Sequence, residues 1–376
     1  MDNINILFKI ILIIFLLKNI NKNLSNKNYY SFKYYYNYTT NYVSFYKLNK
    51  FIKYINISNK GILLYKHNFM KQNNPDVSVI ISLFNRENYI NSTIVSVQNQ
   101  KIYNFEIFIV DDHSTDNSIK YVEKAQKIDP RISLIRNKKN MGALYSKSIG
   151  VLYSKGKYIF SLDSDDMICI DNYIKVLYKE AKKRYYDYIE CNEYIEINLN
   201  DKTINRKKIS TMLLWVKLIK RSIYKEIINR IGSDALKKGI TTLDDNFILL
   251  FLKDNKNFKR INKIGVFHYK RYNDQIFASN LTNEQSIFKF CGNIVNAIDV
   301  LFDISDDSLD SKDYCYYRLN LYLIKGKCFN VTSLKNNITN LFKKFLNSSF
   351  VNDNSKKNIN KALKKMNKKY KKQINI

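Results

Sequence analysis

One stretch decides the fold of this chain: Gly156-Lys-Tyr-Ile-Phe-Ser-Leu-Asp163-Ser-Asp165-Asp166. A turn glycine comes first, and a short β-rich apolar run follows it, which predicts a buried strand. The strand ends in three carboxylates within four residues. Like charges this close repel one another unless they share a cation, and Mg²⁺ binds one or two carboxylates together with substrate phosphates. The stretch therefore predicts a metal-assisted phosphate site at the carboxyl edge of a sheet; the alternative is a loop that caps the next helix.

The composition permits a large core and limits the partners. The chain has 376 residues, 45% of them hydrophobic, which is enough for one large domain or two smaller ones. A formal net charge of +30 suggests nucleic acid or an anionic membrane surface as a partner. However, the lysines are spread along the chain and are dense only at the C-terminus, and no usual nucleic-acid recognition motif is present. We therefore predict no specific nucleic-acid partner.

The cysteines do not indicate a metal site. There are five, an odd number, and no Cys-x-x-Cys pair occurs. Zinc and a disulfide framework are both poorly supported, so buried reduced thiols are the expectation.

The N-terminal part divides into two segments. Residues 6–17 are apolar except for Lys9, which is short for a bilayer span, and no small-residue cleavage site follows. We predict a hydrophobic anchor or signal-like segment at 1–20 and a membrane-associated protein, on the cytosolic or the Golgi/ER side; the alternative is a buried helix of a soluble protein. Residues 21–74 are rich in Asn, Tyr and Lys and predict a low-complexity stem.

From residue 75 onward, predicted strands alternate with predicted helices, which indicates right-handed βαβ units and a mostly parallel sheet. The predicted strands are 77–83, 105–110, 132–135, 157–162 and 188–197, and the helices between them are 87–98, 115–127, 142–154 and 171–184. Less regular strands (212–219, 264–272) and helices (221–230, 246–252) follow. Beyond 283 we expect amphipathic helices and a basic tail that frays from Lys356. The predicted domains are thus 75–282 and a helical C-terminal extension, 283–376.

Four ordered motifs resemble glycosyltransferase family 2. Residues 77–85 with Glu87-Asn-Tyr-Ile90 resemble its opening strand and helix, and residues 105–118 are similar to its second strand with the Asp-Asp-Gly-Ser loop. Asn140-Met-Gly142 and the stretch 156–166 resemble its later landmarks, ending in the Asp-x-Asp motif. Asp244-Asp245 resembles its Glu-Asp pair. The resemblance covers about 75–275 and is far more specific than any one motif.

The resemblance implies a GT-A fold, which is an α/β Rossmann-like sheet flanked by helices, and an inverting transfer from a nucleotide-sugar, here a UDP-sugar, with Mn²⁺ or Mg²⁺. It implies a carbohydrate, lipid-linked or glycoprotein acceptor. It also assigns roles: Asp165 and Asp163 to the metal, Asp163 also to the ribose, and Asp245 to the general base, with Asp244 able to share that work. The donor side comprises Ser82, Phe84, Glu87, Asp112, Asp163 and Arg271.

Several positions leave two interpretations open. Asp245 can be a helix cap, and Arg271 has even odds of contacting a phosphate. Trp215 suits an acceptor platform and a core position about equally. For His268 we favour a satisfied strand histidine, and for Lys147 a solvated helix face. His113 stands where Gly is common, and His tolerates positive φ better than most residues, so we expect the turn to be kept.

Two other functions are alternatives to a glycosyltransferase, and one sequence feature opposes each. A sugar-phosphate nucleotidyltransferase shares a similar core, but the loop after the first strand lacks the glycines that its triphosphate needs. A degenerate, non-catalytic binding module is opposed by the intact Asp165 and Asp245.

Overall fold

The computed structural model describes residues 73–198, 203–208, 213–252, 257–270, 284–305, 334–349 and 351–374, with a few single residues between 312 and 328. The expected anchor (1–20), the stem up to residue 72 and Arg271 lie outside the described residues. Within the described part, no helix is both long enough and apolar enough to cross a membrane.

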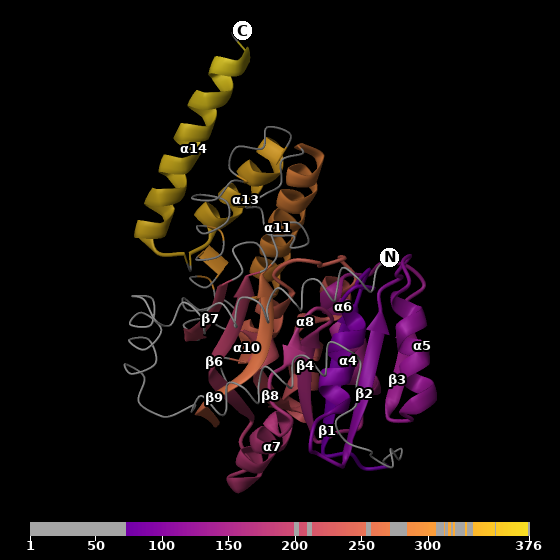
Figure 1. Ribbon diagram of the computed structural model, residues 1–376. Coiled ribbons are helices and arrows are strands. Elements are labelled where there is room, and N and C mark those ends of the chain that lie inside the picture. Colours follow the sequence, from indigo (N-terminus) through magenta and orange to yellow (C-terminus); the bar gives the residue numbers. More distant parts are fainter. Residues whose placement is uncertain are drawn as a thin grey trace, which may run out of the picture.

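Four parallel strands form the first half of one nine-stranded sheet. Their spatial order is β3 (Ile132–Arg136), β2 (Phe105–Asp111), β1 (Val77–Leu83) and β4 (Tyr158–Asp163). The chain proceeds from β1 outward to β3 and then returns to β4 on the other side of β1. Ligands bind at the carboxyl ends of the strands where the order reverses in this way. The fold thus places the ends of β1, β2 and β4 at the candidate site (Figure 1).

The second half of the sheet is mixed. It continues through β8 (Lys217–Lys220), β6 (Tyr188–Asn198), β9 (Phe258–Lys270) and β5 (Met167–Ile168), with β7 (Thr203–Lys208) paired to β6. Strand β8 runs antiparallel to both of its neighbours, whereas β6 and β9 are parallel. The sheet is therefore entirely parallel only in its first half, and β6–β9 is the parallel pair of its second half. The strand predicted at 212–219 is in fact a 3₁₀ turn, Leu214–Val216, followed by β8, and β5 and β7 were not predicted.

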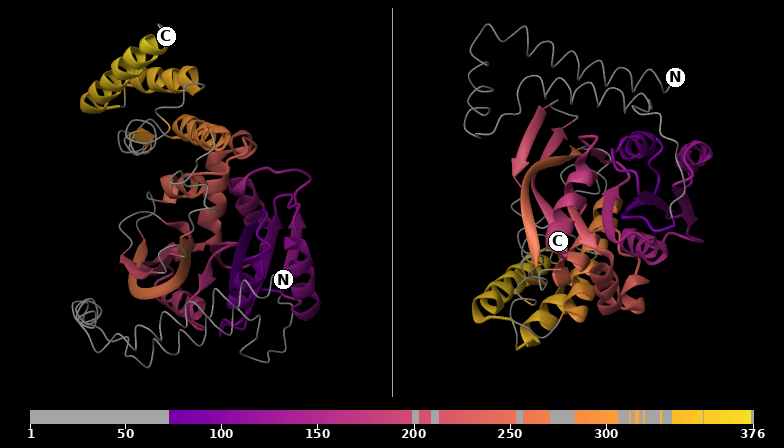
Figure 2. Two further views of the ribbon diagram at one scale, coloured as in Figure 1. Left: turned by 45° about the horizontal axis from the view of Figure 1, so that its top comes forward. Right: turned by 90° about the horizontal axis from the view of Figure 1, so that it is seen from below.

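Helices cover both faces of the sheet (Figure 2). Those of the first half are α4 (Ile90–Gln98), α5 (Ser118–Ile128), α6 (Ala143–Tyr153) and α7 (Tyr173–Lys183), and those of the second are α8 (Arg221–Ile231), α9 (Ser233–Leu236) and α10 (Asp244–Leu252). Helix α10 is apolar all round, and every residue from Asn246 to Leu252 is buried. A helix of this kind belongs inside a core. Its burial fixes the position of Asp244 and Asp245 at its first turn.

The C-terminal helices extend the same core. They are α11 (Glu284–Ile304), α13 (Lys335–Asn347) and α14 (Asp353–Ile374), and they lie together at one end of the molecule (Figures 1 and 2). Their buried side chains belong to one cluster with those of α8 and α10. The tail expected to fray from Lys356 is instead helical. Ile359, Ala362 and Met366 recur at helical spacing and are buried, which stabilises the helix.

The structure also corrects the prediction for the cysteines. Cys291 of α11 is bonded to Cys328, with their Cα atoms 5.2 Å apart, while Cys169, Cys191 and Cys315 are buried free thiols. The two bonded residues are 37 positions apart in the sequence, and only the tertiary fold brings them together.

A substitution at Gly156 tests how tightly the start of the stretch 156–166 is packed. A Cβ atom there would lie 2.5 Å from the backbone nitrogen of Ser78, whereas a Cβ at Gly292 of α11 would meet only Leu334, at 4.0 Å. We expect Gly156→Ala to lower the free energy of unfolding by about 1–3 kcal/mol. The control Gly292→Ala should be neutral or stabilising, by up to about 1 kcal/mol, since Ala favours helix over Gly. Urea denaturation checks both; equal stability of the two variants would contradict the close packing.

Candidate active site

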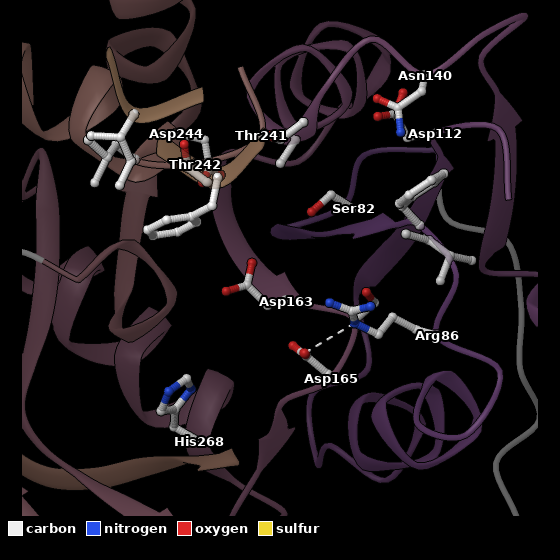
Figure 3. A pocket seen from close by; sticks show the side chains of 17 residues that line it. Ser82, Arg86, Asp112, Asn140, Asp163, Asp165, Thr241, Thr242, Asp244 and His268 are labelled. Atoms are coloured by element: carbon white, nitrogen blue, oxygen red, sulfur yellow. Dashed lines mark hydrogen bonds and ion pairs between the residues drawn. The ribbon is translucent and has the colours of Figure 1, made fainter. Parts of the chain in front are cut away.

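One pocket lies at the carboxyl edge of the sheet (Figure 3). Ser82 at the end of β1, Phe84 just after it, and Asp112 after β2 line one side. Asp163 at the end of β4 and Asp165 in the loop after it also line the pocket. Asp244, from the first turn of α10, faces the same space. The structure therefore brings together residues that are more than 160 positions apart in the sequence.

Asp112 organises the loop that carries Asn140. It is buried, and its carboxylate accepts hydrogen bonds from Asn137 Nδ2 and from the backbone nitrogens of Met141 and Gly142, each at 2.8 Å. Gly142 adopts φ +90°, and a Cβ there would lie 2.4 Å from the carbonyl oxygen of Ile240. This glycine thus allows the loop to pack directly against the backbone that leads to α10. The preceding turn also has the expected geometry, with His113 at φ 69°.

Asp165 is paired with Arg86, to which no sequence motif assigned a role. Arg86 Nε lies 3.2 Å from Asp165 Oδ2, and both side chains are about one-quarter exposed. The backbone nitrogen of Arg86 donates to Ser118 Oγ at 2.8 Å, which anchors the loop after β1 to α5. Arg86 therefore brings a positive charge to the acidic end of β4.

Lys147 is buried at the centre of the carboxylates, so the interpretation as a solvated helix face is wrong. Its side chain is only 5% exposed, and its Nζ lies 3.1 Å from Asp163, 2.7 Å from Asp244 and 2.8 Å from Asp245. Burial disfavours the charged amine, but the three carboxylates outweigh burial and raise the lysine pKa well above its ordinary value. Lys147 therefore stays protonated and ties β4 to α10.

Asp245 points toward this lysine and toward the protein backbone. Its second oxygen accepts the backbone N–H of Leu214 at 3.3 Å. Burial raises the pKa of Asp245 to about 6, and the neighbouring Asp244 and Asp163 act in the same direction against Lys147. Asp244 lines the pocket. The two adjacent carboxylates thus take different orientations at the same helix start.

His268 of β9, which is partly exposed at the pocket wall, pairs with the buried Asp166. Its Nδ1 lies 3.1 Å from Asp166 Oδ1, and its ring stacks on Trp215 at 5.3 Å between centroids. Burial lowers the histidine pKa, but Asp166, Asp165 and Asp163 together outweigh it and raise the pKa to about 9. His268 is therefore protonated at neutral pH. Trp215 is buried in the core, which favours its interpretation as a core residue.

Comparison with known proteins gives the family. Residues 78–242 match the family model described as "Glycosyl transferase family 2". These residues are a glycosyltransferase family 2 domain. The predicted enzyme class, a glycosyltransferase, is thereby confirmed at the level of the family. The match ends two residues before Asp244.

Several proteins with similar sequences are also named glycosyltransferases. An uncharacterized glycosyltransferase of Haemophilus influenzae is 42% identical over 96 residues, covering 26% of this chain and 30% of its own. A second glycosyltransferase from that organism is 29% identical over 212 residues, covering 52% of this chain and 82% of its own length. Glycosyltransferase GlyG of Streptococcus pneumoniae is 31% identical over 118 residues, covering 31% of this chain and 39% of its own length. The chain thus spans less than half of the length of the first and third relatives.

A solved structure confirms the fold. Residues 1–349 of S. aureus TarS, crystallised with UDP-GlcNAc, superpose with a TM-score of 0.54 at 15% identity, covering 81% of this chain and 92% of TarS 1–349. The GT-A-like α/β fold expected from the resemblance is therefore present.

Some predicted positions of the family 2 domain lie away from the pocket, and others were missed. Glu87 Oε2 accepts two bonds from Asn117 at the start of α5, both at 2.9 Å, and Glu87 does not line the pocket. Arg271 is outside the described residues. Helix α11 contributes Phe290 and Ile294, which no motif marked. The pocket is also lined by Arg86, Thr241, Thr242 and Leu243, to which no motif assigned a role, and by Asn140, which was noted only as part of a motif.

The acidic residues of β4 have the chemistry for a divalent ion. No group of three His, Cys, Asp or Glu side chains among the described residues is arranged to hold a metal by itself. Two carboxylates, Asp163 and Asp165, nevertheless face the pocket, and Mg²⁺ uses one or two carboxylates with substrate phosphates. The donor set therefore fits an ion that binds together with a phosphate ligand.

Replacing Lys147 by Met tests its role among the carboxylates. Breaking a buried ion pair by removing one partner costs about 3–5 kcal/mol of unfolding free energy, because the remaining charge is uncompensated. Without the cation the pKa of Asp245, already about 6, rises further above its unfolded value. The folded state then favours protonated carboxyls, so the loss should be largest above about pH 6 and shrink as the pH falls.

Urea denaturation at several pH values measures this difference. Lys147→Arg keeps the charge and serves as the matched control, with a smaller loss that is nearly independent of pH. A Lys147→Met variant as stable as wild type in mildly alkaline buffer would contradict the central role of this lysine.

Proposed function

We propose that this protein is an inverting glycosyltransferase that moves a sugar from a UDP-sugar to an acceptor hydroxyl with the help of a divalent metal ion. One observation carries the proposal: carboxylates from two separate segments meet at one pocket. Asp163 and Asp165 come from the β4 end, and Asp244 comes from α10. Asp245 does not line the pocket; it lies beside it, 2.8 Å from Lys147 Nζ. Membrane association through residues 1–20 belongs to the same proposal.

The donor half is the side formed by β1 and β2. Phe84 is 43% exposed and lines the pocket, so its ring is available to stack on a nucleotide base. Ser82 lies beside Asp163 in the sheet register, at the level where a ribose would bind. Asp112, already held by the Asn140 loop, has lone pairs left to accept a base N–H. The UDP-GlcNAc bound by TarS supports a uridine nucleotide as the donor class.

Positive charge is needed where the diphosphate leaves. Mn²⁺ or Mg²⁺, held by Asp165 with Asp163, would supply Lewis-acid stabilisation of the leaving diphosphate. The chain adds its own cations: the Arg86 guanidinium and the protonated His268 both line the pocket. Arg271, three residues beyond His268, is proposed to contribute at the same place.

Proton removal is assigned to the α10 side. A hydroxyl is a poor nucleophile until a carboxylate accepts its proton, and such a base works best with a pKa near the operating pH. The pKa of about 6 fits Asp245 for this task, and Asp244, which faces the pocket, orients the acceptor or shares the proton. Attack from the α10 side, opposite the leaving diphosphate, inverts the anomeric carbon.

The metal assignment is tested by binding, independently of turnover. Wild type should be stabilised by UDP with Mn²⁺ in a thermal-shift experiment, as expected for a ligand that binds only the folded state. Asp165→Ala should lose this Mn²⁺-dependent stabilisation. Asp234→Ala, an exposed carboxylate of α9, is the control and should keep it. Equal Mn²⁺-dependent stabilisation of wild type and Asp165→Ala would remove Asp165 as a metal ligand.

The base assignment is tested by separating binding from transfer. Asp245→Asn should lower the transfer rate by about 10²–10⁴-fold, the usual contribution of a general base, while UDP affinity stays near that of wild type. Asp244→Asn is the matched control and should lose less. Unimpaired turnover in Asp245→Asn rules it out as the base, and UDP binding without turnover in wild type, across a panel of acceptors, favours a non-catalytic module.

A further inference from the structure

Helix α14 carries a concentration of positive charge that the transferase site does not use. Its 22 residues include nine lysines, no arginine and one acidic residue, Asp353, so its net charge is 9 − 1 = +8. The whole chain carries +30 over 376 residues, so the charge per residue in α14 is several times the average. None of the described side chains of α13 and α14 lines the pocket.

The helical geometry of α14 places several of its lysines in a row on one face. Four exposed lysines recur at spacings of four, three and four residues, and we call them the lysine stripe: Lys357, Lys361, Lys364 and Lys368. The buried residues Ser355, Ile359, Ala362 and Met366 follow the same spacing, two positions earlier. Two positions correspond to about 200° around a helix. The lysine stripe therefore lies directly opposite the face that packs into the core.

This arrangement limits what α14 can bind. Of its described apolar side chains, Ile359, Ala362 and Met366 are buried in the core and Leu363 packs against it, so these are not available to insert into a bilayer interior. The outward face offers ammonium groups along a straight helix about 33 Å long. A row of point charges, with no guanidinium fork for bidentate contacts and no described aromatic side chain on the stripe, suits a flat anionic surface better than the grooves and bases of a nucleic acid.

We propose that the lysine stripe of α14 docks the protein onto an anionic lipid bilayer. Lysines near such a surface each strengthen binding by about fivefold, and the attraction fades beyond a Debye length. Helix α14 lies at one end of the molecule (Figure 1), and the four stripe lysines are exposed, so a bilayer can approach the stripe without covering the sheet. The proposal does not depend on the transferase mechanism, because it involves none of the pocket residues.

Vesicle co-sedimentation of the full chain tests the proposal. Wild type should bind phosphatidylcholine vesicles containing about one-quarter phosphatidylglycerol better than pure phosphatidylcholine, and more weakly at high salt. The triple variant Lys357→Gln, Lys361→Gln, Lys364→Gln should lose on the order of 100-fold in affinity for the anionic vesicles, from about fivefold for each lysine. Binding to pure phosphatidylcholine, where an apolar segment elsewhere would act, should be unchanged.

The matched control removes three lysines from another exposed helix. Lys120, Lys124 and Lys127 of α5 are all exposed, and their change to Gln alters the net charge by the same amount. This variant should bind anionic vesicles like wild type. If the stripe variant fails to fold by circular dichroism, the charge-preserving Lys→Arg variant at the same three positions should fold and keep the binding.

Three results would overturn the proposal. They are equal vesicle binding by the stripe variant and wild type, equal losses in the α14 and α5 variants, and tighter binding to a labelled DNA duplex than to anionic vesicles. The last result would make the stripe a nucleic-acid surface. Transfer activity on a soluble acceptor should be the same in wild type and stripe variant, which separates this test from the tests of the active site.

Discussion

The active site depends on one buried cation among carboxylates. Lys147 contacts Asp163, Asp244 and Asp245 within 3.1 Å. Two unit charges at about 4 Å interact by about 4 kcal/mol in a protein environment of intermediate dielectric, so three carboxylates together without a cation would repel strongly. The lysine converts this repulsion into a link between β4 and α10. It lets a strand end and a helix start, both acidic, face one pocket.

Backbone packing places Lys147 where it can do this. Gly142 lets the start of α6 lie against Ile240, and the N–H of Leu144 donates to the Ile240 carbonyl at 3.3 Å. Asp112 holds the same loop from the other side. The loop that ends in Gly142 therefore connects the β2 side of the pocket, at Asp112, with the segment leading to α10, and Lys147 follows in α6. These contacts set the position of the β2 side of the pocket relative to the α10 side.

The sequence predicted the strands and the acidic residues of the site but not their partners. Strands β1, β2 and β4 are apolar runs that end in Ser82, Asp112 and Asp163, so local pattern alone places these residues at one edge. Lys147 and Arg86 could not be placed, because their partners are up to 98 and 79 positions away, and a lysine or arginine on an isolated helix or loop looks solvated. The tail was misread for a related reason. Its few apolar residues are diluted by Lys and Asn, and their helical spacing matters only once α13 covers them.

The side chains around the pocket carry an excess of negative charge. Five carboxylates lie in or beside it: Asp163, Asp165, Asp166, Asp244 and Asp245. Three cations face them, namely Arg86, Lys147 and the protonated His268, so the described residues leave a net charge of 3 − 5 = −2. Under the proposed function, a diphosphate alone would be repelled by this excess of negative charge, and Asp163 and Asp165 would hold a divalent ion that supplies the missing positive charge. The formal charge of +30 is a property of the whole chain, whereas the side chains around the pocket are acidic in balance.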